Sequence, residues 1–148
     1  METTNPQPRE ALRVVEVIES EVGQPRNDGT PGSGLYRVPL HLNRQATDLE
    51  ARLIERTWDS PHRYTTMHRP GICSVSGDTV SLNGTTVSEL KQYHLETMKG
   101  VLASVDREAA EIEAREHARR EREEQHRQVT LRAHHEEIEG INESLNFE

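Results

Sequence analysis

Apolar positions near the start of the chain alternate with polar ones at the spacing of extended strands. Residues 11–22 are rich in valine, and a strand here would place Val14 and Ile18 on one face and Val15 and Val17 on the other. A short helix is the alternative for this segment, although its β-branched residues favour a strand.

A second alternating segment, residues 35–42, follows a loop at 23–34 that is rich in Gly, Pro, Asn and Ser. Because Pro39 has no N–H to donate to a neighbouring strand, we expect this second strand to lie at an edge of the sheet or to carry a bulge at the proline.

The next segment has the spacing of a helix. Residues 47–58 begin with Thr47 and have Glu50 three residues later, which is the sequence of a capping box. Four apolar side chains fall on one face at helical spacing, and these are Leu49, Leu53, Ile54 and Trp58. We expect Glu50 and the other charged residues of this helix to face solvent.

A short hairpin follows the first helix. Residues 72–76 and 79–82 are brief alternating strands, and the dipeptide Gly-Asp at 77–78 predicts a tight turn between them. The dipeptide Asn-Gly at 83–84 predicts another turn. Before the hairpin, within residues 62–71, we expect an extended piece through Tyr64–Met67 and then a turn at Pro70-Gly71.

The longest periodic segment opens at Thr86, where Glu89 completes the sequence of a second capping box. Apolar side chains then recur at spacings of four and three, which is typical of a coiled-coil seam or of a stripe that faces a core. The stripe consists of Leu90, His94, Met98, Val101, Val105, Ala109 and Ile112. The corresponding positions after Ile112 are charged, so the stripe ends there.

The last part of the chain is strongly charged. Residues 113–128 contain no Ile, Leu, Val, Met, Phe, Tyr or Trp, so a helix there would depend on weak pairs of opposite charge four residues apart. Apolar residues return after this segment, and Ile138, Ile141 and Leu145 have the spacing of a short amphipathic helix. We expect an extension that is helical alone, folds on binding, or forms part of a coiled coil.

The order of these elements is β-β-α-β-β-α, which predicts an α+β fold: a small antiparallel sheet with helices on one face and a long charged C-terminal helix. We expect a disordered N-terminus at 1–10, a domain at 11–112 that includes the first part of the long helix, and a charged helical extension at 113–148. Ile, Leu, Val and Phe total only 30 of 148 residues, so burial in an oligomer would help the small core.

The net charge of −8 argues against general nucleic-acid binding, because binding phosphates requires basic side chains. A nucleic-acid-associated protein would have to use the arginine-rich segment 37–69, which contains Arg37, Arg44, Arg52, Arg56, Arg63 and Arg69. We find no signal peptide or membrane span in the sequence, and its single cysteine allows no intrachain disulfide. We therefore expect a cytoplasmic protein with no membrane partner.

No motif points to catalysis, a metal or a cofactor. His62 and His68 lie six residues apart in an expected loop, and His134 and His135 would point about 100° apart on a helix, so neither pair has the spacing of zinc ligands. Cys73 could pair with a histidine as nucleophile and base, but a cysteine between apolar strand residues more often packs as a small hydrophobic side chain. We expect no catalytic residue, metal ligand or cofactor.

The segment after the first helix gathers residue types that are common at interface hot spots. Its candidate binding residues are Trp58, Arg63, Tyr64, Met67, His68 and Arg69. The alternative is a structured loop that covers the core without binding a partner.

We expect, from these patterns, a non-enzymatic interaction or assembly protein that forms a homo-oligomer, or docks on a larger protein, through its long C-terminal helix. The alternatives are a nucleic-acid-associated regulator that uses the 37–69 face and an accessory subunit of an enzyme complex.

Overall fold

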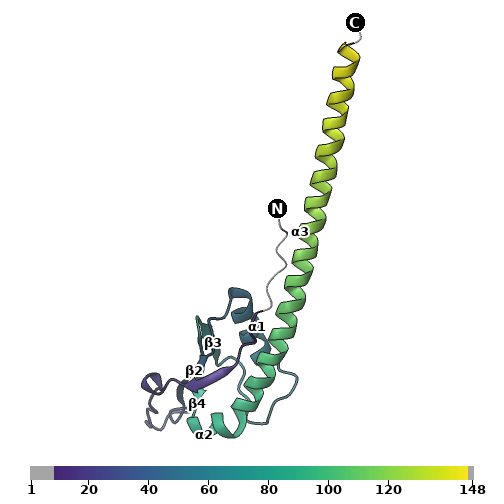
Figure 1. Cartoon of the computed structure of the whole chain (residues 1–148). Helices are drawn as coiled ribbons and strands as arrows, with labels where there is room; N and C mark the ends of the chain where they lie inside the picture. The colour runs from purple at the N-terminus through teal and green to yellow at the C-terminus, as the bar shows by residue number, and fades with distance from the viewer. Residues whose placement is uncertain (1–8, 147–148) are drawn as a thin grey trace. The chain divides into compact units, whose positions relative to one another are not determined.

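A computed structural model describes residues 9–146 of the chain, in two compact units (Figure 1). Of the described residues, the first unit contains 9–110 and the second contains 111–146. The N-terminus that was expected to be disordered, residues 1–10, lies almost entirely outside the described residues.

The first unit is built on a four-stranded antiparallel sheet with the spatial order β1-β2-β4-β3 (Figure 1). The strands are β1 Val14–Val17, β2 Tyr36–Leu42, β3 Cys73–Ser76 and β4 Thr79–Thr85. Helix α1 lies between β2 and β3 in the sequence, and the long helical segment follows β4. The predicted α+β fold and its β-β-α-β-β-α order are confirmed.

One face of the sheet is apolar because alternate residues of neighbouring strands pair across it. Val38 pairs with Leu82 and Leu40 with Val80, and all four side chains are fully buried. At the edge of the sheet, Val17 pairs with Leu40 and is half-buried. This face forms the core that the helices cover.

Strand β1 is shorter and less regular than the sequence predicted. A bulge lies between Val14 and Glu16, so Val14 and Val17 are both half-buried while Val15 is 47% exposed. Simple alternation had placed Val15 and Val17 on the same face. The extra residue of the bulge shifts the alternation by one position, and that prediction was wrong.

Pro39 lies in a central strand and not, as expected, at an edge or a bulge. Its carbonyl accepts a hydrogen bond from the N–H of Ile18 at 3.0 Å. In an antiparallel ladder the N–H and C=O of one residue face the same neighbour, so the missing N–H of Pro39 would have met the Ile18 carbonyl. That carbonyl accepts instead from Glu21 N–H at 3.0 Å, in the 3-10 turn η1 (Glu19–Glu21). The proline therefore coincides with the end of β1 and costs the sheet no ladder bond.

The second turn that was predicted, at Asn83-Gly84, is instead part of β4. The pairing with β2 passes from Asn83 to Thr85 and skips Gly84, which has a φ of +132°. A Cβ atom at this position would lie 3.3 Å from Ile72 Cγ2. The backbone angle and the close approach both favour glycine, and here they form a bulge within the strand instead of a turn.

Helix α1 (Asp48–Asp59) begins with the predicted capping box. The N–H of Glu50 donates to Thr47 Oγ1 at 3.2 Å, and the N–H of Thr47 donates to the Glu50 carboxylate at 2.9 Å. Leu53, Ile54 and Trp58 are buried, so the predicted apolar face also covers the core.

Glu50 itself corrects the sequence-based prediction, because its side chain is 2% exposed and does not face solvent. Both terminal nitrogens of the Arg44 guanidinium, Nη1 and Nη2, donate to its carboxylate, at 2.8 and 2.7 Å. Burial alone would raise the pKa of Glu50, but the hydrogen bonds from Arg44 and Thr47 outweigh it and hold that pKa below its usual value. The partner lies outside the helix, so helical periodicity gave no sign of this pair.

The long helical segment has three parts, namely α2 (Val87–Glu89), the π-helical η2 (Leu90–His94) and α3 (Leu95–Asn146). Thr86 caps it, because its side-chain oxygen accepts from Glu89 N–H at 3.0 Å. The reciprocal hydrogen bond of a capping box, from the Thr86 N–H to the Glu89 carboxylate, is not formed. The Glu89 carboxylate instead accepts hydrogen bonds from Arg69 and Thr85.

The apolar stripe of this segment lies inside the chain's own fold. Exposed fractions of 4% or less are found for Leu90, His94, Met98, Val101, Val105 and Ala109. Ile112 is half-buried. Of the two interpretations of the stripe, the structure therefore favours the core-facing one.

In the second unit, α3 is an exposed helix, and every side chain from 119 to 146 is exposed. The expected ion pairs are present, with 3.9 Å between Arg115 and Glu111 and 3.4 Å between Arg120 and Glu116. Such exposed pairs contribute only about 0.2–0.5 kcal/mol each.

Candidate functional site

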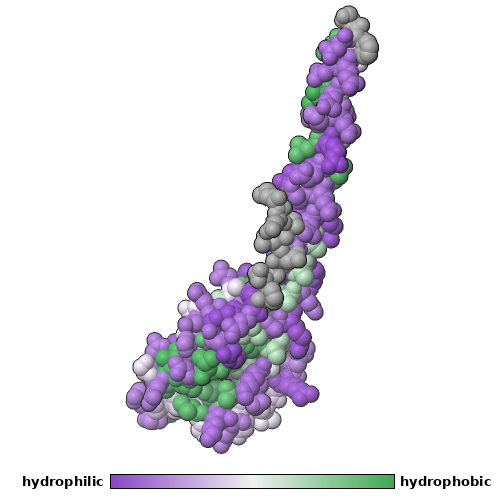
Figure 2. Space-filling model, in the orientation of Figure 1, coloured by the Kyte–Doolittle hydropathy of each residue, from purple (hydrophilic) through white to green (hydrophobic). Residues whose placement is uncertain are grey.

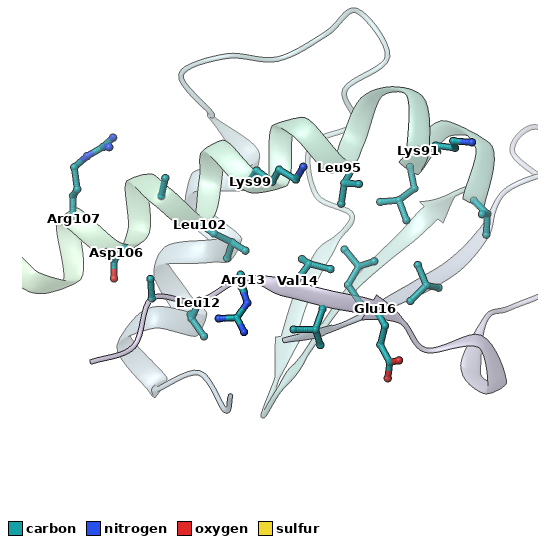
Figure 3. Close-up of a pocket in the computed structure, with 17 residues that line it drawn as sticks. Leu12, Arg13, Val14, Glu16, Lys91, Leu95, Lys99, Leu102, Asp106 and Arg107 are labelled. Carbon is teal, nitrogen blue, oxygen red and sulfur yellow. The ribbon is translucent and has the colours of Figure 1, made fainter. Parts of the chain in front are cut away.

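An apolar groove of about 810 Å³ lies in the first unit, between the edge strand β1 and the helical segment that starts at α2 (Figure 3). We call it the β1–α3 groove. The apolar side chains that define it include Leu12, Val14, Val17, Leu90, Leu95 and Leu102. In Figure 3, Leu95 and Leu102 extend from the helix toward Val14 on β1.

The groove forms because α3 carries a second apolar row beside its buried stripe. Leu95 and Leu102 are seven residues apart, so they project from the same side of the helix. Leu102 is 3% exposed and Leu95 is half-buried. The sequence interpretation followed only the stripe and missed this row, although the seven-residue spacing was a signal that could have revealed it.

Apolar surface remains accessible around this groove. Val15 on β1 is 47% exposed and Val87 on α2 is 44% exposed, and both line the groove. Figure 2 shows apolar residues gathered on the surface of the first unit. Large exposed apolar side chains that cluster in a concavity are typical of a binding surface.

The side chains that line the groove include more basic than acidic ones, and two of the basic ones, Arg13 and Lys99, also pair with Glu10 and Glu96. Its lining includes the four basic residues Arg13, Lys91, Lys99 and Arg107, and the two acidic residues Glu16 and Asp106. Both lysines come from the helical side and Arg13 from the strand side (Figure 3). A positive rim around an apolar floor suits an apolar group that is flanked by acidic ones.

The candidate binding loop after α1 is only partly available to a partner. Trp58 is fully buried, and its indole N–H donates to the Arg69 carbonyl at 2.9 Å. His68 lies against the Trp58 ring, with 4.5 Å between ring centroids, and its Nε2 is 2.7 Å from the Trp58 carbonyl oxygen. Met67 is half-buried, while Arg63 and Tyr64 are exposed. The structure thus brings Trp58, His68 and Arg69 together as an anchor for the loop.

The loop is also less extended than the sequence predicted. A turn closes where His68 N–H donates to the Thr65 carbonyl at 3.1 Å, and this turn replaces the expected extended piece. The turn predicted at Pro70-Gly71 is confirmed, with a φ of +82° at Gly71. A second hollow of about 760 Å³ borders Arg63 and Tyr64.

A partly buried polar cluster joins this loop to η2. Arg69 forms an ion pair with Glu89, and Glu89 Oε2 is 3.7 Å from Nε2 of His94. His94 is fully buried, and its ring nitrogens have no hydrogen-bond partner among residues 9–146. Burial lowers the pKa of His94; Glu89 opposes this effect, and Arg69 and His68 add to it. Within the part of the chain that the structure describes, neither Glu89 nor His94 lines the groove or the hollow.

In the sequence, Cys73 was the candidate nucleophile and the histidines were the candidate metal ligands. Burial, followed by the charges of Glu55 and Asp59, raises the pKa of Cys73 to about 12, so the reactive thiolate is strongly disfavoured. Between residues 9 and 146, no group of three or more His, Cys, Asp or Glu side chains is placed to hold a metal ion.

Most arginines of the 37–69 segment bond within the chain. Arg37 donates to Ser81 Oγ at 2.8 Å, and Arg52 donates to the Asp48 carbonyl at 3.3 Å. Carboxylates pair with three others, and these pairs are Arg44–Glu50, Arg56–Glu108 and Arg69–Glu89. Arg63 is the exposed arginine of the candidate loop.

Comparison with known proteins found no family model, no curated protein and no solved structure that matches this chain. Among residues 9–146, no helix is long and apolar enough to cross a membrane. The surfaces of the two units are therefore the features from which a function can be inferred.

Proposed function

We propose that this protein is a non-enzymatic assembly protein that self-associates through the C-terminal part of α3, residues 111–146. The observation that carries this proposal is a row of apolar side chains on the exposed helix. The row consists of Leu131, Ile138, Ile141 and Leu145, which are 45–63% exposed. We call it the terminal stripe.

The terminal stripe is confined to one side of the helix. At about 100° per residue, its four members fall within an arc of about 80°. Val129 is also 63% exposed, but it lies about 160° from Leu131, on the opposite side. The row therefore has the arrangement of a docking face, and a similarly exposed valine on the other side offers a matched control.

Energetics support a docking role for this face. A helix in water gains most of its stability from packing an apolar face, and charge pairs add little. Burying the exposed half of each terminal-stripe side chain would contribute about 1 kcal/mol, or about 4 kcal/mol for the set. Association itself costs at least about 4 kcal/mol, so a stable complex needs further surface besides the stripe.

The nucleic-acid alternative has less support. Five arginines of its proposed face bond with residues of the same chain, as described above, and breaking these bonds would oppose phosphate binding. Nothing in the described surfaces favours an accessory subunit of an enzyme over a self-associating protein.

The test is the mass of the full chain by light scattering on a sizing column, over a range of concentrations. We expect a mass above the 16.9 kDa of one chain for the natural sequence. The variant Leu131→Gln, Ile138→Gln, Ile141→Gln, Leu145→Gln should return to the mass of one chain. Val129→Gln should assemble as the natural sequence does. A natural chain that stays monomeric at every concentration would refute self-association.

A further inference from the structure

We infer that the β1–α3 groove receives the terminal stripe of a second copy of this chain. This inference rests on the proposed function and names the surface to which the terminal stripe binds. Two apolar surfaces of the described chain lack a cover: the groove in the first unit and the stripe in the second. The same chain supplies both, so a second copy can provide each with its partner.

A helix suits this groove better than an added strand does. Strand β1 has only four residues and is interrupted by a bulge between Val14 and Glu16, which makes its free edge a poor template for strand pairing. The apolar side chains of the groove instead lie between β1 and the helical segment. A helix laid there would pack beside α3 and insert apolar side chains spaced three, four and seven residues apart.

Leu95, Val15 and Val87 give the groove the additional surface that the stripe needs. All three line it and are half-buried or exposed. Covering them together with the terminal stripe buries apolar area on both partners. A pair of stripes alone would bury only the stripe side chains.

Charge complementarity also favours this occupant. The groove is lined by four basic and two acidic side chains. The segment 131–146 that carries the terminal stripe has one arginine and four glutamates. Glu137 and Glu139 lie on either side of the stripe, each about 85–115° from its centre. Bound in the groove, they would face a rim that includes Lys91 and Lys99.

The symmetry of the assembly follows from the use of two different surfaces. If each of two copies binds the helix of the other, the pair closes as a dimer. If the exchange does not close, copies add head to tail into longer chains. Both arrangements require that the groove and the stripe of different copies meet.

A mixing experiment with full-length chains tests this pairing. The groove variant is Val15→Glu with Val87→Glu, at positions that are 47% and 44% exposed, so the fold should tolerate both changes. The stripe variant is the four-glutamine chain described above. We expect each variant alone to have the mass of one chain. An equimolar mixture should give the mass of two, because an intact stripe then meets an intact groove. Circular dichroism and melting of each variant check that it is folded.

The outcomes separate the inference from the proposed function. If the groove variant alone still assembles, the terminal stripes pair with each other; the inference then fails while self-association stands. If both variants are monomers and their mixture is too, the inference also fails. If the natural chain is monomeric, the proposed function itself fails.

A charge exchange provides a second test. Lys91→Glu with Lys99→Glu should weaken assembly at low salt by tenfold or more, because the glutamates beside the terminal stripe would then face like charges. Adding Glu137→Lys and Glu139→Lys to the same chain should restore most of the loss. If this fourfold variant assembles no better than the chain with only Lys91→Glu and Lys99→Glu, the proposed contact is wrong.

Discussion

Two of the apolar rows on helix α3, the buried stripe and the terminal stripe, have similar spacing and opposite environments. Met98 and Val105 are seven residues apart and no more than 1% exposed, whereas Ile138 and Leu145, also seven apart, are 45% and 63% exposed. The first pair belongs to the unit that contains the sheet, and the second belongs to the other unit. Spacing therefore identifies the face of a helix that is suited to packing, but it does not identify what covers that face.

The charged pairs of the two units also differ in burial. In the first unit, Glu50 is buried, and its carboxylate accepts from both terminal guanidinium nitrogens of Arg44. This two-bond pairing fixes the relative orientation of the two side chains. In the second, pairs such as Glu116 with Arg120 join exposed side chains on successive turns of one helix. A buried charge that loses its partner costs several kcal/mol, whereas an exposed pair is worth a fraction of one.

The largest expected effect is the difference in stability between a substitution in the buried stripe and one in the terminal stripe. Val105→Asp places a carboxylate in the core and should lower the free energy of unfolding of the first unit by about 4 kcal/mol or more. Ile138→Asp, at an exposed position, should change it by less than about 0.5 kcal/mol when both are measured at concentrations at which the chain is monomeric. Urea unfolding of both variants measures the difference. Equal destabilisation by the two changes would contradict the contrast between the units.

The second effect concerns the buried charge. Arg44→Ala leaves the Glu50 carboxylate buried without its main partner and should cost about 3 kcal/mol. Replacing both residues, as Arg44→Met with Glu50→Leu, should cost less than the single change, because no unpaired charge remains. Arg122→Ala, on the exposed helix, serves as the control and should be nearly neutral. If the double variant is less stable than Arg44→Ala, the cost does not come from an unpaired carboxylate.

A smaller effect depends on pH. The pKa of His94 is lowered by burial, so below about 6.5 the unfolded chain binds a proton that the folded chain does not. Stability from this residue is complete above that pH and is lost as the pH falls below it. The melting temperature should therefore decrease between pH 7.5 and 5.5.

His94→Leu should reduce that decrease in melting temperature, while the exposed His135→Leu should leave it unchanged. The lowered pKa of Glu89 acts in a different window, because its stabilising contribution is lost only below about 4.5. A decrease of the same size in the His94 variant would mean that another group titrates between pH 7.5 and 5.5.

The smallest effect tests the exposed ion pairs. Glu116→Gln removes the partner of Arg120 and should weaken the local helix by about 0.2–0.5 kcal/mol. Hydrogen exchange of the amides around residue 116 should become slightly faster at low salt, and the difference should vanish at high salt. A large or salt-independent change would show that Glu116 has a structural role beyond this pair.

Where short-range interactions determine a feature, the sequence predicted it well. The capping box of Thr47 and Glu50 and the hairpin turn at Gly77-Asp78 involve residues within a few positions of each other, and both are present. Periodicity also identified Val101 as part of a packing face. These features depend on local backbone geometry and the helical repeat.

Predictions failed where a distant residue supplies the partner. Whether Pro39 is tolerated in a central strand depends on where β1 ends, and the solvation of Glu50 depends on Arg44. The candidate loop was chosen by residue type, and the fold divides it into the buried Trp58 and the exposed Tyr64. No pattern within a single segment contains this information.

The order of the elements, the N-caps Thr47 and Thr86, and the buried stripe of the long helix were predictable from the sequence, because capping and the helical and strand repeats are local properties. The cover over the row that contains Met98, the groove beside that row and the exposure of the terminal stripe could be seen only in the folded chain. Burial depends on which surfaces meet, and chain segments far apart in the sequence bring those surfaces together.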